Sequence, residues 1–228
     1  MPLVVLDTSV ALPATLSPRS HPRKLLVLLA YGALAYRAEH LRLDLDELTA
    51  LAASEGGEVY GAESYRRQIE RADRRRTAMS ELLPVGAPDD WCAVGFSVLF
   101  DEFERKLREA GPRIDPKIRE QDVAPLRRQI EAVCVAGPPP FDPTVVPAHT
   151  RDPADDAIVH GALLAGSDFL ISDDRDIVPD GAEHTYEFLG HRMLAVTFRQ
   201  FTATYFEPRD FPWRVLDGAW LREAFARV

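Results

Sequence analysis

The sequence has few cysteines, no long apolar run and no signal-like start. Two cysteines among 228 residues, Cys92 and Cys134, are too few for a disulfide framework or a thiolate zinc site, so we expect both to be packing residues. The longest apolar run extends only from Leu25 to Tyr36, which is well short of the roughly 20 residues that span a bilayer. No basic segment precedes the first apolar residues, unlike in a secretory signal. We therefore expect a cytoplasmic protein without a membrane helix.

Positively charged residues are outnumbered by acidic ones, so the formal net charge is −9. This balance excludes non-specific nucleic-acid binding over the whole surface, since phosphates are neutralised by Lys and Arg. Arginines gather locally between residues 66 and 76 at helical spacings. They form either a solvated helix face paired with Glu63 and Glu70 or a phosphate-contacting patch. In the second case the candidate substrate-binding residues are Arg71, Arg74 and Arg75.

Apolar content is sufficient for a folded α/β domain, because 46% of the residues are hydrophobic. Continuous apolar runs predict strands, and helical patterns with caps and breakers predict helices. The expected strands are 3–6, 91–94, 132–136, 169–172 and 193–196, and the expected helices are 22–37, 44–54, 62–83, 98–110, 121–131, 153–164 and one from 197. The alternation favours an open, mostly parallel sheet flanked by helices.

Four acidic residues stand at the edges of apolar stretches: Asp7, Glu102, Asp156 and Asp174. Ligands of open α/β sheets collect at the carboxyl ends of strands, where Asp7 and Asp174 are expected. A lone Asp after a strand is usually a turn former or a helix cap. Several carboxylates that meet repel one another unless a cation neutralises them. An oxygen-only ligand set favours Mg²⁺ or Mn²⁺ over zinc.

Four segments, 6–10, 97–107, 152–159 and 167–176, resemble in order the four motifs of PIN-domain nucleases. The resemblance covers roughly residues 2–35 and 90–205, and is closest to bacterial PIN proteins that are toxin components of toxin–antitoxin systems. It implies a three-layer PIN-like domain over 1–205 and a Mg²⁺- or Mn²⁺-dependent endoribonuclease that hydrolyses RNA. It also implies a small antitoxin protein as a partner.

The resemblance assigns roles to the acidic residues. Asp7 and Asp174 would contact the metal directly, while Glu102 and Asp156 would complete the cluster, partly through metal-bound waters. The metal would activate water and screen charge on the phosphate. The supporting residues would be Ser9 or Thr8, which orient Asp7, and Asp176 at the same rim.

The third acid has two candidates. A helical projection places Asp155 nearer the middle of the apolar face of its helix, whereas the motif register favours Asp156, which directly precedes the aliphatic run. Asp152 is expected to cap this helix. His160 and His184 are candidate substrate contacts, although a structural or exposed histidine is the more common case.

The chain differs from the family in the long stretch between Asp7 and Glu102. Residues 38–90 are expected to be a helical insertion that acts as a lid or substrate-binding arm, covers the site, or forms the face of a homodimer. Residues 206–228 form an aromatic C-terminal extension that we expect to pack on its own domain.

Two other functions compete with the nuclease. A phosphatase of the haloacid-dehalogenase type would need a second Asp where Ser9 stands, so the local sequence opposes it. A PIN-fold RNA- or metal-binding module without turnover is the other alternative, although all four acids are present.

Overall fold

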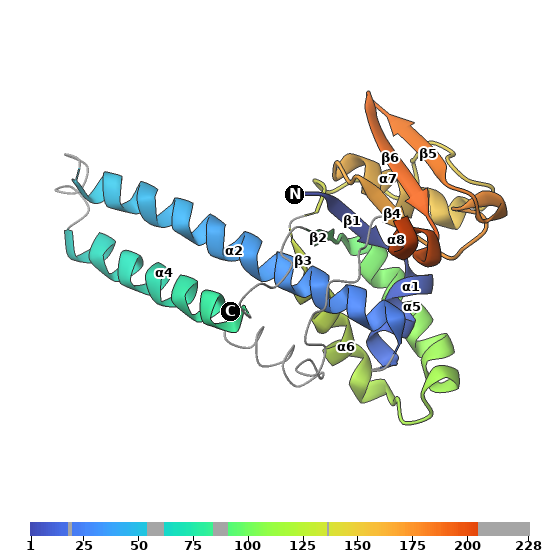
Figure 1. The fold of residues 1–228 in the computed structure, drawn as a ribbon, viewed down its shortest axis with the longest axis horizontal. Coiled ribbons are helices and arrows are strands. Elements are labelled where there is room, and N and C mark those ends of the chain that lie inside the picture. Colours follow the sequence, from blue (N-terminus) through green and yellow to red (C-terminus); the bar gives the residue numbers. More distant parts are fainter. Residues whose placement is uncertain (18–19, 54–61, 84–90, 136, 205–228) are drawn as a thin grey trace.

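A computed structural model describes residues 1–17, 20–53, 62–83, 91–135 and 137–204, and it shows a six-stranded sheet with helices on both faces (Figure 1). The strand order is β3-β2-β1-β4-β6-β5. The strands are β1 Leu3–Leu6, β2 Cys92–Val94, β3 Cys134–Val135, β4 Phe169–Ile171, β5 His184–Phe188 and β6 His191–Val196. The predicted α/β class is therefore confirmed.

Helices connect these strands and form the outer layers. They are α1 Thr8–Leu16, α2 His21–Ala53, α4 Ala62–Leu82, α5 Ser97–Ile114, α6 Glu120–Val133, α7 Pro153–Leu164 and α8 Phe198–Thr204, with a 3₁₀ turn at Pro179–Gly181. None of the helices within the described ranges combines the length and apolar character that crossing a membrane requires.

The sheet is mostly parallel, as predicted. β1 pairs in parallel with β2 and β4, and β4 pairs in parallel with β6. β5, which the sequence did not predict, is antiparallel to β6. The turn between them uses Leu189 and Gly190 at φ 50° and 81°, the positive φ values that two-residue hairpins need. A leucine at the first turn position is unusual, and this explains why the hairpin was missed.

Alternation along β1 divides the core into two layers. Val4 and Leu6 pack with Phe103 of α5 on one face of the sheet. Val5 points to the other face and packs with Ile158 of α7. Because successive side chains of a strand point to opposite faces, one short apolar run supplies both layers. The result is a helix–sheet–helix sandwich in which the first strand is central.

A pair of long helices projects from this sandwich (Figure 1). We call the outer part of α2, residues 37–53, together with α4 the helical arm. The sequence predicted separate helices at 22–37 and 44–54, and this was wrong because α2 is continuous. Leu41, Leu45 and Leu48 are half-buried, so the apolar stripe continues at helical spacing, while Asp44 is exposed mid-helix and caps nothing.

The arm contains the described part of the predicted insertion. Residues 54–61 and 84–90 of that insertion, and the predicted extension at 206–228, lie outside the described residues. At the base of the arm, the guanidinium of Arg37 donates hydrogen bonds to the carbonyls of Ala132 and Cys134, at 2.7 and 2.8 Å. These bonds fix α2 to the end of α6, where helix carbonyls lack intrahelical donors.

The contact between α2 and β2 depends on a missing side chain. A Cβ atom at Gly32 would lie 1.7 Å from the backbone oxygen of Trp91. We expect Gly32→Ala to lower the free energy of unfolding by about 1–3 kcal/mol, because backbone cannot rotate away. Urea denaturation measures the loss. The control is Gly111→Ala, where the new Cβ would lie 3.1 Å from the flexible end of Leu107. Equal stability of the two variants would contradict this packing.

Candidate metal centre

The carboxylate of Asp7 is buried where β1 ends and α1 begins. Its Oδ2 atom accepts hydrogen bonds from Ser9 Oγ at 2.6 Å, from the Ser9 amide at 3.2 Å and from Ser172 Oγ at 2.8 Å. Its Oδ1 atom receives only a 3.4 Å contact from Thr8 Oγ1. Asp7 therefore caps α1, and its orientation is fixed by Ser9, as the resemblance implied, and also by Ser172, which the sequence reasoning missed.

Ser172 links Asp7 to the second strand end. Its hydroxyl also accepts a hydrogen bond from the amide of Asp174 at 3.0 Å. The carboxylate of Asp174 in turn accepts a 2.9 Å hydrogen bond from the amide of Asp176. β1 and β4 are parallel neighbours, so their carboxyl ends share one edge of the sheet. The loop after β4 is thus organised from the Asp7 side of that edge.

Three carboxylates converge beside this loop: Asp155, Asp174 and Asp176. One oxygen from each lies within 4.8 Å of the other two. Opposite ligands of an octahedral Mg²⁺ ion are about 4.2 Å apart, at roughly 2.1 Å per bond. Small side-chain rotations would therefore bring these oxygens into one coordination sphere. Oxygen donors of this kind suit a hard divalent cation, and we call the three residues the carboxylate cluster.

The pKa of Asp155 reflects the electrostatic repulsion within the carboxylate cluster. Its pKa is raised to about 7 by burial and by repulsion from Asp174 and Asp7, with smaller contributions from Asp152 and Asp176. The positive end of α7 acts in the opposite direction, because Asp155 lies in the first helical turn. Burial and repulsion outweigh the helix dipole. A bound cation would remove the repulsion.

Asp156 has a different task from its neighbour. Its Oδ1 atom accepts hydrogen bonds from the amides of His149 and Thr150, both at 2.7 Å, and from Thr150 Oγ1 at 3.0 Å. Burial works to raise the pKa of Asp156, but these hydrogen bonds outweigh it and the pKa is lowered. The geometry thus favours Asp155 as the third acid, and Asp156 as the anchor of the proline-rich connector before α7.

Glu102 lies on α5 and is engaged by an arginine of the same helix. Arg105 Nη2 contacts both carboxylate oxygens, at 3.0 and 2.8 Å, and Lys106 Nζ lies 3.9 Å away. Glu102 is not a member of the carboxylate cluster among the described residues. Coordination by Glu102 would require it to exchange Arg105 for the cation.

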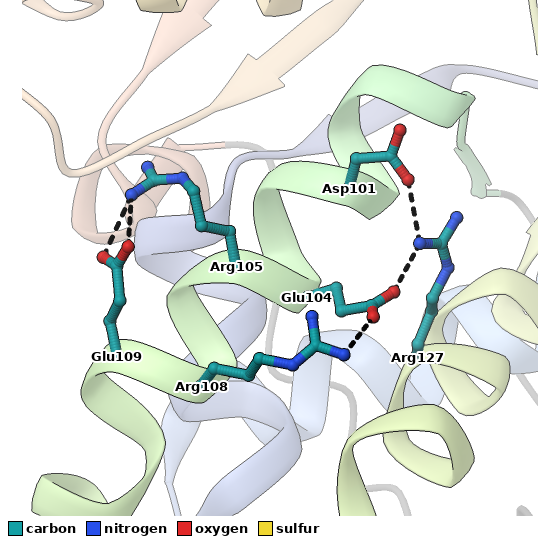
Figure 2. Close-up of a pocket in the computed structure, with 6 residues that line it drawn as sticks. All are labelled: Asp101, Glu104, Arg105, Arg108, Glu109 and Arg127. Atoms are coloured by element: carbon teal, nitrogen blue, oxygen red, sulfur yellow. Dashed lines mark hydrogen bonds and ion pairs between the residues drawn. The ribbon is translucent and has the colours of Figure 1, made fainter. Parts of the chain in front are cut away.

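A pocket beside Glu102 is occupied by further paired charges (Figure 2). Arg127 of α6 points toward Asp101 and Glu104 of α5, with Nη1 to oxygen distances of 2.8 and 2.5 Å. Arg108 Nη2 binds Glu104 Oε1 from the other side, at 2.6 Å. Because these charges already neutralise one another, the pocket joins α6 to α5 and offers no unpaired charge to a ligand.

Two histidines pack behind Asp156. His149 Nε2 and His160 Nδ1 are 3.1 Å apart, and the two rings are stacked at a centroid distance of 5.4 Å. Phe188 meets His160 edge-on. Burial lowers the pKa of both histidines, and in His149 the neighbouring His160 adds to the effect. His160 therefore packs within an aromatic cluster. His184 packs in the same way against Tyr186, at a ring centroid distance of 4.6 Å.

Tyr186 supports the loop that carries Asp176. Its hydroxyl donates a 2.8 Å hydrogen bond to the carbonyl of Ile177. The pKa of Tyr186 is raised to about 12, first by burial and then by Asp155, Asp156 and Asp176. The tyrosine therefore stays neutral and serves as a fixed donor.

No protein-family model, curated protein or solved structure matches the chain in comparisons of its sequence and structure. The fold and the carboxylate cluster thus carry the functional argument. What they establish is an α/β protein with a three-carboxylate cluster that is suited to a metal ion.

The site residues named from the sequence divide into three groups. Asp174 and Asp176 belong to the carboxylate cluster, and Asp7 adjoins it through Ser172 and through its repulsion of Asp155. Asp156 and Glu102 are bound by other partners, as described above. The arginines Arg71, Arg74 and Arg75 are exposed on α4 of the helical arm. The catalytic and binding roles of all these residues remain predictions.

The opposite environments of Asp155 and Asp156 give a direct test in metal-free buffer. Asp155→Asn should raise the melting temperature. The difference from the wild type should grow between about pH 4 and 7, because the folded wild type binds the proton of the Asp155 carboxyl group more tightly than the unfolded chain does and loses stability as that group ionises. Asp156→Asn should lower the free energy of unfolding by about 1–3 kcal/mol at pH 5 and pH 8 alike, since the hydrogen-bonded anion is present at both. Thermal melts with EDTA measure both effects. Equal behaviour of the two variants would contradict these assignments.

Proposed function

We propose that the protein is a divalent-metal-dependent endoribonuclease of the PIN type. The observation that supports this most strongly is the convergence of Asp155, Asp174 and Asp176 at the carboxyl ends of β1 and β4, next to the buried carboxylate of Asp7. Ligand sites of open α/β sheets lie at this edge. Metal-assisted phosphodiester hydrolysis uses acidic clusters of this kind.

The chain's own residues would divide the work. A divalent cation, when bound, supplies Lewis acidity and an activated water. Asp174 and Asp155 would hold it, and Asp176 would complete the rim. Asp7 would add negative charge from a position that Ser9 and Ser172 keep fixed. In the metal-free protein the pKa of Asp155 is raised to about 7, and a bound cation would lower it by neutralising the repulsion.

RNA as the substrate, and a small antitoxin as the partner, come from the resemblance of the four segments to PIN toxins. Single-stranded or looped RNA fits an acidic protein better than a duplex does, because an unpaired backbone can be splayed into a site. An antitoxin would block hydrolysis by covering the carboxylate cluster.

Cleavage of fluorescently labelled RNA with Mn²⁺ tests the proposal. Asp155→Asn and Asp174→Asn should each lower the rate by about 10²-fold or more, because each removes a charged cation ligand. The matched control is Asp44→Asn on the exposed side of α2, which should cleave at the wild-type rate. Asp156→Asn, compared at equal folded fraction, should be impaired less than Asp155→Asn.

Binding of the cation is measured separately by titration calorimetry with Mn²⁺. Asp155→Asn and Asp174→Asn should weaken binding by about tenfold or more, since each removes one of three carboxylates. Cation binding by the wild type without cleavage of any RNA would leave a binding module in place of the enzyme. Wild-type cleavage by both Asn variants would refute the proposed site.

A further inference from the structure

The outer surface of α4 groups most of its charges by sign, although Arg66 lies among the acidic residues. At 100° per residue, Arg67, Arg71, Arg74 and Arg75 fall within an arc of about 100°. The four acidic residues Glu63, Glu70, Asp73 and Glu81 fall within a neighbouring arc of about 80°. The apolar residues Ile69 and Met79 of α4 point the other way, and Met79 packs with Leu34 of α2. We call the four arginines the basic strip.

The charges of the basic strip are exposed and only partly neutralised. All four arginines are exposed. Within the described parts of the chain, Arg71 and Arg75 have no ion pair, and Arg67 is paired with Glu63 at a fully solvated position. Arg74 uses its Nε to contact the carbonyl of Glu70, which leaves its outer nitrogens available. An exposed pair such as Arg67–Glu63 contributes little and exchanges readily.

Within the described residues, no acidic side chain of α2 forms an ion pair with the strip, although Asp44 and Glu47 are exposed on the same arm. On α2 the acidic side chains Glu39 and Asp46 are already bound to Arg42, at 2.6 and 2.8 Å. The strip therefore stands out as a local positive surface on a protein of net charge −9. Concentrating cations on one side of an exposed helix, instead of interleaving them with acids, lowers no folding energy by itself. An external anion would neutralise the arginines of the strip that have no ion pair within the described residues.

We propose that the basic strip binds the phosphodiester backbone of a nucleic-acid strand. From Arg67 to Arg75 the helix rises about 12 Å, so the four guanidinium groups can reach more than one phosphate of a single strand. Guanidinium groups bind phosphate through paired hydrogen bonds. A protein partner would need an apolar anchor within the contact, but Ile69 is half-buried and the exposed positions between these arginines are polar or charged.

Binding at the strip would be independent of base sequence and sensitive to salt, because the contacts reach the backbone only. It also goes beyond hydrolysis at the carboxylate cluster, since an arm can hold a strand whether or not the strand is cut. RNA and DNA share the phosphodiester, so both are used as probes.

The test is fluorescence anisotropy of a labelled single-stranded oligonucleotide, as RNA and as DNA of the same sequence, in EDTA and at several NaCl concentrations. Arg71→Gln with Arg75→Gln should weaken binding of at least one probe by roughly ten- to thirtyfold at 0.1 M NaCl, and should reduce the slope of log K against log salt by about 1.4, or 0.7 per lost phosphate contact. The matched control is Arg42→Gln with Arg66→Gln, which removes the same charge from the arm outside the strip. It should stay within about twofold of wild type.

Three results would overturn the inference. They are an unchanged affinity and salt slope in the strip variant, an equal loss in the control variant, and strip-dependent binding of polyglutamate without binding of either oligonucleotide. Circular dichroism verifies that the variants remain helical. The combined Asp155→Asn and Asp174→Asn variant separates the two proposals: wild-type oligonucleotide binding without cleavage supports the strip, and cleavage by this variant counts only against the proposed active site.

Discussion

Hydrogen bonds from Ser9 and Ser172 to the buried carboxylate of Asp7 tie the first strand to the fourth. A buried carboxylate without such donors would be strongly unfavourable, so these bonds allow a charge to exist at the sheet edge. The same Ser172 hydroxyl accepts a hydrogen bond from the amide of Asp174, and the loop that carries Asp176 begins at this point. The position of two of the three clustered acids therefore depends on how one buried anion is satisfied.

Adjacent acids at the start of α7 illustrate how position decides chemistry. Consecutive residues of a helix project about 100° apart, so Asp155 and Asp156 enter different surroundings. Asp156 receives three hydrogen bonds from the connector and is stabilised as an anion. Asp155 faces other carboxylates and its pKa rises. Asp156 thus anchors the connector to α7, and Asp155 is the residue whose repulsion from other carboxylates a cation would remove.

Much of the sheet edge was predictable, because short apolar runs followed by Asp mark strand ends reliably in a parallel sheet. Asp7 and Asp174 were found this way. The choice between Asp155 and Asp156 was not, since it depends on amides at His149 and Thr150 whose approach no local pattern encodes. Helix α1 was not predicted, because its Pro13 and small residues obscure a helical period. The continuity of α2 was missed because Asp44 was read as the start of a new helix, whereas it lies exposed in the middle of one.

The unbroken course of α2 has a mechanical consequence. One helix of 33 residues runs from the sheet, where Gly32 touches the backbone of Trp91, to the tip of the arm. Its length is about 50 Å at 1.5 Å per residue. A rod of this kind has no joint where the arm leaves the sandwich, and Arg37 binds it to α6 at that point. A load on α4 would therefore reach β2 as leverage about that contact, and the arm and the sheet edge would respond as one stiff body.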